Sequence, residues 1–98
     1  MFSKLPELWG VASEAGFTVV RRGSPLTQFS VEYAEGERVL RYTLENLVAG
    51  SAHPIDSRLI GPWLSPHDRE DLAPAEQVKI AGRIADGMNF LGDKFVVV

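Results

Sequence analysis

The feature that most constrains the fold is a single long amphipathic stretch near the end of the chain, from Pro74 to Leu91. Large apolar side chains recur in it at helical spacing, at Ile80, Ile84, Met88 and Leu91. This periodicity predicts one α-helix with a single apolar face. An isolated helix of this kind is marginal in water, so the rest of the chain must supply an apolar surface that covers this face.

The ends of this helix carry ordinary start and stop signals. Pro74 suits the first helical position, Asp71 or Ala73 is a candidate N-cap, and Glu76 falls in the first turn, where the helix dipole favours a carboxylate. Gly92 suits the end of the helix. The helix therefore follows the proline-spaced stretch before it almost directly.

The partner surface is a β-hairpin. Apolar and polar residues alternate over Gln28 to Ala34 and again over Glu37 to Leu44, which predicts two strands. Glu35-Gly36 between them predicts a short turn with a glycine able to take positive φ. Because both strands are amphipathic, one face of the hairpin is expected to meet water.

Local patterns assign the remaining segments. Leu5, Leu8, Trp9, Ala12 and Ala15 lie at helical spacing, which predicts a short helix over Pro6 to Ala15 that ends at Gly16. The other expected elements are a strand over Phe17 to Arg22, one helical turn over Glu45 to Gly50, an edge strand over Ile55 to Ile60 and a buried last strand over Phe95 to Val98. The predicted class is α+β: a small, mainly antiparallel sheet with a hairpin, packed against the long C-terminal helix and the short N-terminal helix.

Composition narrows the class of protein. Ninety-eight residues, 45% of them hydrophobic, are expected to form one domain, 1–98. With no cysteine, the chain has no disulfide and no thiolate chemistry. The N-terminal stretch does not read as a signal peptide, and no apolar run approaches the roughly 18 residues of a membrane span, so a cytoplasmic location is expected.

Charge points to a protein partner rather than to nucleic acid. The net charge is −3, and the ten basic residues are scattered, whereas phosphate binding needs a basic patch. A mildly acidic protein suits a basic partner, since complementary charge steers association.

The stretch from Ile60 to Asp71 is irregular because its prolines restrict the residues before them. Trp63 is expected to pin this loop against the sheet. Asp68, Glu70, Asp71 and Glu76 form an acidic cluster where the loop meets the helix. Such a cluster is either an ordinary solvated helix start or a surface that meets a basic partner.

Signals for catalysis or metal binding are weak. His53 and His67 with Asp56, Asp68 and Asp71 could be combined into a metal site, but their spacing predicts no geometry. An acid–base pair of His67 with Asp56 or Asp68 is a further alternative. The serines lie in no nucleophile motif, and the glycines form no phosphate-binding loop. No catalytic residue, metal or cofactor is therefore predicted.

Three helix residues fall outside the amphipathic pattern. Phe90 lies on the side away from the apolar stripe, where it either contacts a partner or is covered by another part of the chain. Gly82 and Gly87 are costly inside a helix, which indicates that another part of the backbone approaches closely there.

A family resemblance adds a function to this fold. After Leu44-Glu45 and a break at Gly50, the chain runs through Trp63-x-x-Pro66-His67-x-x-Glu70, a Leu72-x-x-x-Glu76 helix start and Ile80-x-x-x-Ile84, and closes on Gly92 and a valine-rich end. Over about the last 60 residues this order resembles a family of small immunity proteins from bacterial polymorphic-toxin and contact-dependent inhibition systems. The chain differs from that pattern in its predicted N-terminal helix and in Pro62.

The resemblance implies a protein that binds the toxin domain made by the same cell and occludes its active or substrate-binding surface. The toxin partner would be basic if it were a nuclease. The residues expected to contact it are Trp63, His67, Asp68, Glu70 and Asp71, with Glu35 and Glu37 at the hairpin tip; those in the motif could instead be structural. The alternative is a non-catalytic binding or regulatory module that forms a homodimer through an apolar patch near Phe90 or Val96.

Overall fold

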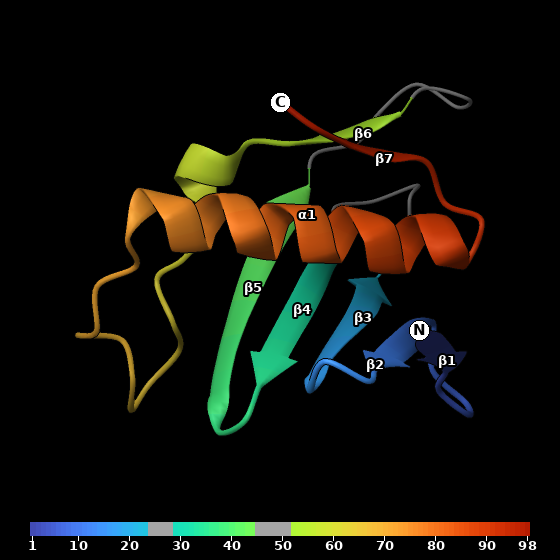
Figure 1. Ribbon diagram of the computed structural model, residues 1–98, viewed down its shortest axis with the longest axis horizontal. Coiled ribbons are helices and arrows are strands. Elements are labelled where there is room, and N and C mark those ends of the chain that lie inside the picture. The colour runs from blue at the N-terminus through green and yellow to red at the C-terminus, as the bar shows by residue number, and fades with distance from the viewer. Residues whose placement is uncertain (24–28, 45–51) are drawn as a thin grey trace.

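The computed structural model describes residues 1–23, 29–44 and 52–98 (Figure 1). Within these ranges the chain forms seven strands, one 3-10 turn and one α-helix. They are β1 Phe2–Lys4, β2 Gly10–Ser13, β3 Phe17–Gly23, β4 Phe29–Glu35, β5 Arg38–Leu44, β6 His53–Ile55, η1 Ser57–Leu59, α1 Pro74–Phe90 and β7 Phe95–Val97. The predicted turn over Glu45 to Gly50 lies outside the described residues.

The first five strands form an antiparallel sheet in chain order, and α1 crosses one face of it (Figure 1). The predicted hairpin is confirmed as β4 and β5, in which Glu35 pairs with Arg38 next to the turn and Gly36 has φ of 62°. Glycine adopts this conformation without the penalty of a Cβ atom. The α+β prediction is therefore confirmed for the sheet and the C-terminal helix.

Helix α1 buries the predicted stripe against the sheet. Ile80, Ala81, Ile84 and Met88 are all buried, and they share one core with inward side chains of the strands, among them Val11, Val19, Val31, Tyr33 and Leu40. The helix ends at Phe90, one residue before the predicted end, and Gly92 follows with φ of 98°.

The two helix glycines differ in their surroundings. A Cβ atom on Gly87 would lie 2.9 Å from Cγ2 of Val11 and 3.3 Å from Cγ2 of Val19, so the strands approach the helix closely there. A Cβ atom on Gly82 would meet nothing within 4 Å. The prediction of close approach is confirmed for Gly87 and wrong for Gly82.

The predicted N-terminal helix is wrong, because the segment forms strands β1 and β2. Gly10 pairs with Val20, and a Cβ atom at Gly10 would lie 2.7 Å from the Val19 carbonyl oxygen, so the close strand pairing requires glycine. Trp9, predicted on the apolar face of a helix, is 37% exposed. Pairing with β3 places Val11 against α1, where it is completely buried, and these tertiary contacts override the helical spacing.

Two further strand predictions need correction. The strand expected over Ile55 to Ile60 is wrong beyond its first residue, because β6 ends at Ile55. The turn η1 follows instead, and the Asp56 carboxylate accepts a hydrogen bond from the Arg58 backbone N–H at its start. The last strand, β7, pairs with β6 in parallel and buries Phe95, while Val96 and Val97 are exposed. It is therefore not the fully buried strand that four consecutive apolar residues indicated.

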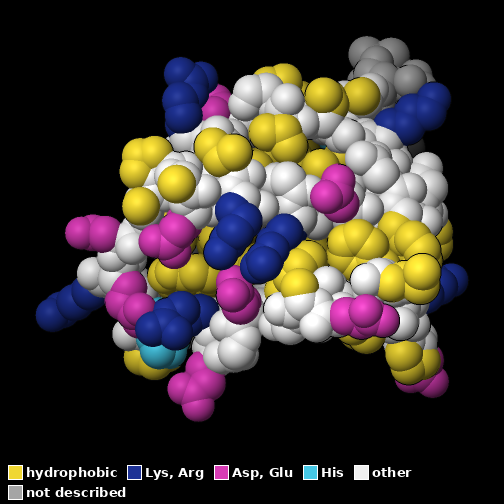
Figure 2. All heavy atoms as spheres, in the orientation of Figure 1, with side chains coloured by type: hydrophobic (Ala, Val, Ile, Leu, Met, Phe, Trp, Pro, Cys, Tyr) yellow, Lys and Arg dark blue, Asp and Glu magenta, His cyan; other side chains and the backbone are white. Residues whose placement is uncertain are grey.

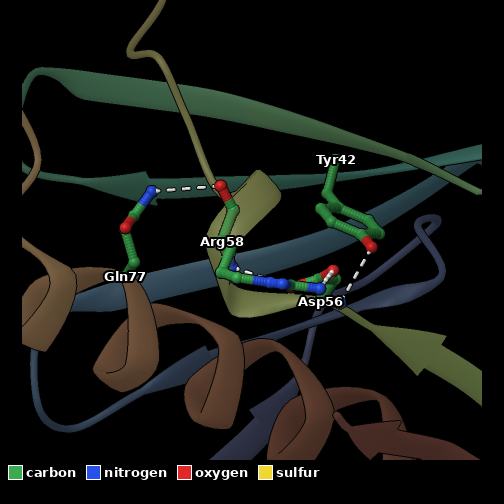
Figure 3. Close-up of polar contacts among 4 residues, drawn as sticks. All are labelled: Tyr42, Asp56, Arg58 and Gln77. Carbon is green, nitrogen blue, oxygen red and sulfur yellow. Dashed lines mark hydrogen bonds and ion pairs between the residues drawn. The ribbon is translucent and has the colours of Figure 1, made fainter.

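Polar contacts fix η1 between the sheet and the helix (Figure 3). The Tyr42 hydroxyl of β5 accepts a hydrogen bond of 3.0 Å from the Asp56 backbone N–H. On the other side, the Gln77 side-chain amide of α1 donates to the carbonyl oxygens of Ile60 at 2.9 Å and Arg58 at 3.5 Å. These bonds set where the chain leaves η1 and enters the proline-rich loop.

In the parts of the chain that the structure describes, no helix is both long and apolar enough to cross a membrane.

Candidate functional site

The seven residues predicted to contact a partner fall on two neighbouring segments. Glu35 ends β4 and Glu37 lies in the following turn. The remaining five lie in the loop between η1 and α1 and are Trp63, His67, Asp68, Glu70 and Asp71. The loop lies beside β5, since the Leu64 backbone N–H donates a 2.7 Å hydrogen bond to the Val39 carbonyl oxygen.

Four of the seven residues line one hollow. A hollow with a volume of about 340 Å³ lies between the hairpin tip, the loop and the start of α1. Its lining consists of Glu35, Arg38, Trp63, Glu70, Asp71, Glu76, Lys79 and Ile80. His67 joins this site through Glu70, whereas Asp68 and Glu37 are exposed and do not line it.

An ion pair between β5 and the loop forms part of the lining of the hollow. Arg38 donates to the same carboxylate oxygen of Glu70 twice, from Nε at 2.8 Å and from a terminal nitrogen at 2.6 Å. The other Glu70 oxygen contacts Nδ1 of His67. These contacts, the Arg38 hydrogen bonds first, hold the pKa of the Glu70 carboxyl below its usual range. Glu70 is therefore ionised and fixed in direction at neutral pH.

The loop backbone supports this arrangement. The His67 N–H donates to the Leu64 carbonyl oxygen, and the Glu70 N–H donates to the His67 carbonyl oxygen, both at 3.0 Å. Two consecutive turns thus carry His67 and Glu70 to the same side of the loop. The peptide bonds before Pro62 and Pro66 are cis.

Trp63 lies beneath the hollow. It is 5% exposed and packs against Tyr33, with ring centroids 6.3 Å apart. The expectation that this tryptophan pins the loop to the sheet is confirmed by its place in the core. A direct contact between Trp63 and a partner stays a prediction.

Polar contacts with Tyr33 and Arg83 fix Glu35, which also lines the hollow. The Tyr33 hydroxyl donates to the Glu35 carboxylate at 2.8 Å, and Arg83 of α1 donates to the Tyr33 oxygen at 2.9 Å. The Arg83 guanidinium also lies over the Phe17 ring, 4.5 Å from its centroid. Burial raises the pKa of Tyr33 to about 12, so its hydroxyl stays a donor to Glu35.

The balance of charge in the hollow is acidic. Four carboxylates line it, against the two cations Arg38 and Lys79. Arg38 is engaged by Glu70, and the structure gives Asp71, Glu76 and Lys79 no ion-pair partner among the described residues. Acidic and basic side chains gather over the loop and the start of α1, on the left side of the face shown in Figure 2.

The contacts of His67 differ from those expected for an acid–base pair or a metal site. The residue bonded to His67 is Glu70, not Asp56 or Asp68, and Asp56 is bound by the Arg58 side chain. Over the described ranges, no three or more His, Asp or Glu residues are grouped so that they could hold a metal ion. What the hollow offers is a set of exposed, partly fixed carboxylates, which suits recognition of a basic group.

Sequence reasoning did not assign Arg38 and Lys79 to the lining, nor Tyr33 and Arg83 to the support of Glu35. The hairpin register contained a signal for Arg38, because it stands opposite Glu35 across the turn. The alternation of β4 placed Tyr33 on the inner face. No local pattern predicts that Arg38 meets Glu70, since the two lie far apart in the chain.

Comparison of the chain with protein-family models, with curated proteins and with solved structures found no match.

Proposed function

We propose that this protein is an immunity protein that acts in the cytoplasm of the producing cell. It would bind the toxin domain made by that cell and occlude the active or substrate-binding surface of the toxin. The observation that carries the proposal is the hollow beside β5, in which exposed carboxylates are held in place by the fold. The proposed role is non-catalytic and needs no cofactor.

Preorganisation supports this role. Glu70 is fixed by Arg38 and His67, and Glu35 is fixed by Tyr33, so a partner that binds here does not have to order these side chains. Carboxylates that are exposed and held in this way suit a basic surface, such as that of a nuclease. Charge complementarity would speed the encounter and set the orientation of the complex.

The loop motif supports the same role independently. In Trp63-x-x-Pro66-His67-x-x-Glu70, the tryptophan attaches the loop to the core while His67 and Glu70 contact each other at the surface. The motif thus combines a buried anchor with an exposed acid.

The test uses the product of the neighbouring gene, which the proposal expects to be the toxin. The two proteins are co-expressed, and cell survival and co-purification are measured. The wild-type chain is expected to protect the cells and to co-purify with the toxin domain. Lack of protection together with lack of binding removes the proposal.

Paired charge reversals then locate the surface. Asp71→Lys with Glu76→Lys changes two carboxylates that have no ion-pair partner among the described residues, so these changes break no known ion pair. The matched control is Glu7→Lys with Asp86→Lys, two exposed acids that do not line the hollow and have no ion-pair partner among the described residues, with the same change in net charge. We expect the first pair to weaken toxin binding about 100-fold and the control about threefold or less. Equal losses would mean that net charge, not the hollow, determines binding.

A further inference from the structure

The inference concerns the edges of the two sheets, because an unpaired edge can bind another strand. Three of the four edges are used to different degrees. At the β5 edge the Leu64 N–H donates to the Val39 carbonyl oxygen, whereas the outward backbone groups of Arg41 and Thr43 have no hydrogen-bond partner among the described residues. On β7, the Asn89 side chain accepts a hydrogen bond from the Phe95 N–H at 2.7 Å and donates to its carbonyl oxygen at 3.1 Å. On β6, Pro54 has no N–H to offer.

Strand β1 is an edge to whose outer side no other described part of the chain bonds. The Leu5 N–H donates to the Gly10 carbonyl oxygen, and the Glu14 N–H donates to the Met1 carbonyl oxygen. Hydrogen-bonded pairs alternate along an antiparallel ladder, so Ser3 also bonds toward β2, and the backbone groups of Phe2 and Lys4 point away from it. No residue in the described ranges pairs with these outward N–H and C=O groups.

An apolar patch adjoins this edge. The Phe2 ring packs against Phe17 and against Phe90 at the end of α1, with centroids 5.9 Å and 5.8 Å apart. Phe90 is nevertheless 53% exposed. Figure 2 shows hydrophobic side chains gathered over this end of the molecule, on the right of the view.

We propose that β1 is the seam of a symmetric homodimer, in which two copies pair antiparallel through this strand. The occupant is a second copy because the edge complements itself. When Phe2 of one copy stands opposite Lys4 of the other, all the outward groups pair, giving four backbone hydrogen bonds across the seam. A register with Phe2 opposite Phe2 pairs only one outward residue of each β1 strand, and one with Lys4 opposite Lys4 brings like charges together.

Side chains fit the same register. Phe2 lies on the α1 side of the sheet, as its contacts with Phe17 and Phe90 show. Because side chains alternate along a strand, Lys4, two residues further on, lies on the same side. The Lys4 stem would therefore lie on the Phe2 ring of the other copy, and Ser3 would face Ser3 on the opposite side. The result is one continuous sheet with both helices on the same face.

This dimer goes beyond the proposed function and does not depend on it. β1 and β5 are the two opposite edges of the five-stranded sheet, and the hollow lies beside β5. Each copy in the dimer would therefore keep its hollow open. Two toxin-binding surfaces would be presented at the far ends of the joined sheet.

The test is sedimentation equilibrium of the full chain, without toxin, from about 10 µM to 1 mM, the range in which weak interfaces dissociate. Lys4→Pro removes an N–H that β2 does not use, and an edge strand tolerates proline. It deletes two of the four bonds across the seam, so we expect dimerisation about 30-fold weaker. Lys4→Ala is the control: it removes the same side chain, keeps the N–H and should weaken dimerisation about fivefold or less.

Amide hydrogen exchange in the wild-type chain gives a second readout that needs no variant. The Phe2 and Lys4 amides are expected to become protected as protein concentration rises. A monomer at 1 mM, a dimer in which both amides stay fast, or equal effects of Lys4→Pro and Lys4→Ala would overturn the proposal. Protection of the Phe2 amide only when toxin is added would also overturn it, because the occupant would then be a strand of the toxin.

Discussion

Gly82 and Gly87 lie five positions apart on α1, and the structure predicts opposite effects of the same substitution. At Gly82 a methyl group would enter open space. At Gly87 it would lie 2.9 Å from Val11 and 3.3 Å from Val19, both completely buried. Valine side chains are stiff, so these neighbours cannot easily turn away.

The magnitudes follow from two competing terms. Replacing glycine by alanine inside a helix gains about 1 kcal/mol of stability. Overpacking a well-packed core costs about 1–3 kcal/mol. Gly82→Ala is therefore expected to raise the free energy of unfolding by about 0.5–1 kcal/mol. Gly87→Ala is expected to lower it by about 1 kcal/mol, leaving a difference of about 2 kcal/mol between the variants.

Urea unfolding followed by circular dichroism measures this difference. The slopes of the two transitions should match, because the surface exposed on unfolding is nearly unchanged. The midpoints should then differ by about 1–2 M urea, with Gly82→Ala above the wild type. If Gly87→Ala is stabilised as much as Gly82→Ala, the close packing of α1 on β2 and β3 is refuted.

Three further predictions concern polar and aromatic contacts. Asp93→Asn weakens the ion pair with Arg21, in which both side chains are less than one-fifth exposed. It should lower the free energy of unfolding by about 1–3 kcal/mol, measured by thermal unfolding. The control Asp86→Asn changes an exposed residue and should lower it by about 0.5 kcal/mol or less. Burial raises the pKa of Tyr33 from its ordinary value of 10.0 to about 12, so the neutral hydroxyl stabilises the fold. Its contribution to the free energy of unfolding is complete below about pH 10 and is lost as pH rises from about 10 to about 12. Stability measured over this range should fall, and Tyr33→Phe should flatten the fall; an unchanged profile would contradict it. Trp63→Ala should cost about 3–5 kcal/mol in urea unfolding, and a loss of toxin binding without a loss of stability would instead make Trp63 a contact residue.

Local patterns predicted the long elements well. The stripe of α1 and the alternation of β4 and β5 each repeat over several turns or residue pairs, so the apolar face is defined several times over. The N-terminal strands are only three and four residues long, too short to show a period of two. Their residues happened to lie at helical spacing, and only the non-local pairing of Gly10 and Val11 with β3 decides their conformation.

The site was predictable in part for a similar reason. The acidic residues next to α1 are visible as a cluster in the sequence, and Glu35 belongs to the hairpin tip. What brings the two together is the path of the loop beside β5, which depends on the burial of Trp63 and on the pairing of Leu64 with Val39. Contacts between residues so far apart in the sequence are set by the folded core, so the spacing of residues in the sequence could not predict which cations pair with Glu70.

The small β6–β7 sheet has a consequence for the order in which the molecule opens. His53 pairs with Phe95, 42 positions further along the chain, and the outermost bond joins Val98 to Ile55 at 2.9 Å. This sheet has only two strands, and Val96 and Val97 are exposed, whereas Val31 and Tyr33 are completely buried within the five-stranded sheet. We therefore expect the β6–β7 pair to open locally while the five-stranded sheet stays intact, and its amides to exchange with solvent well before those of Val31 and Tyr33.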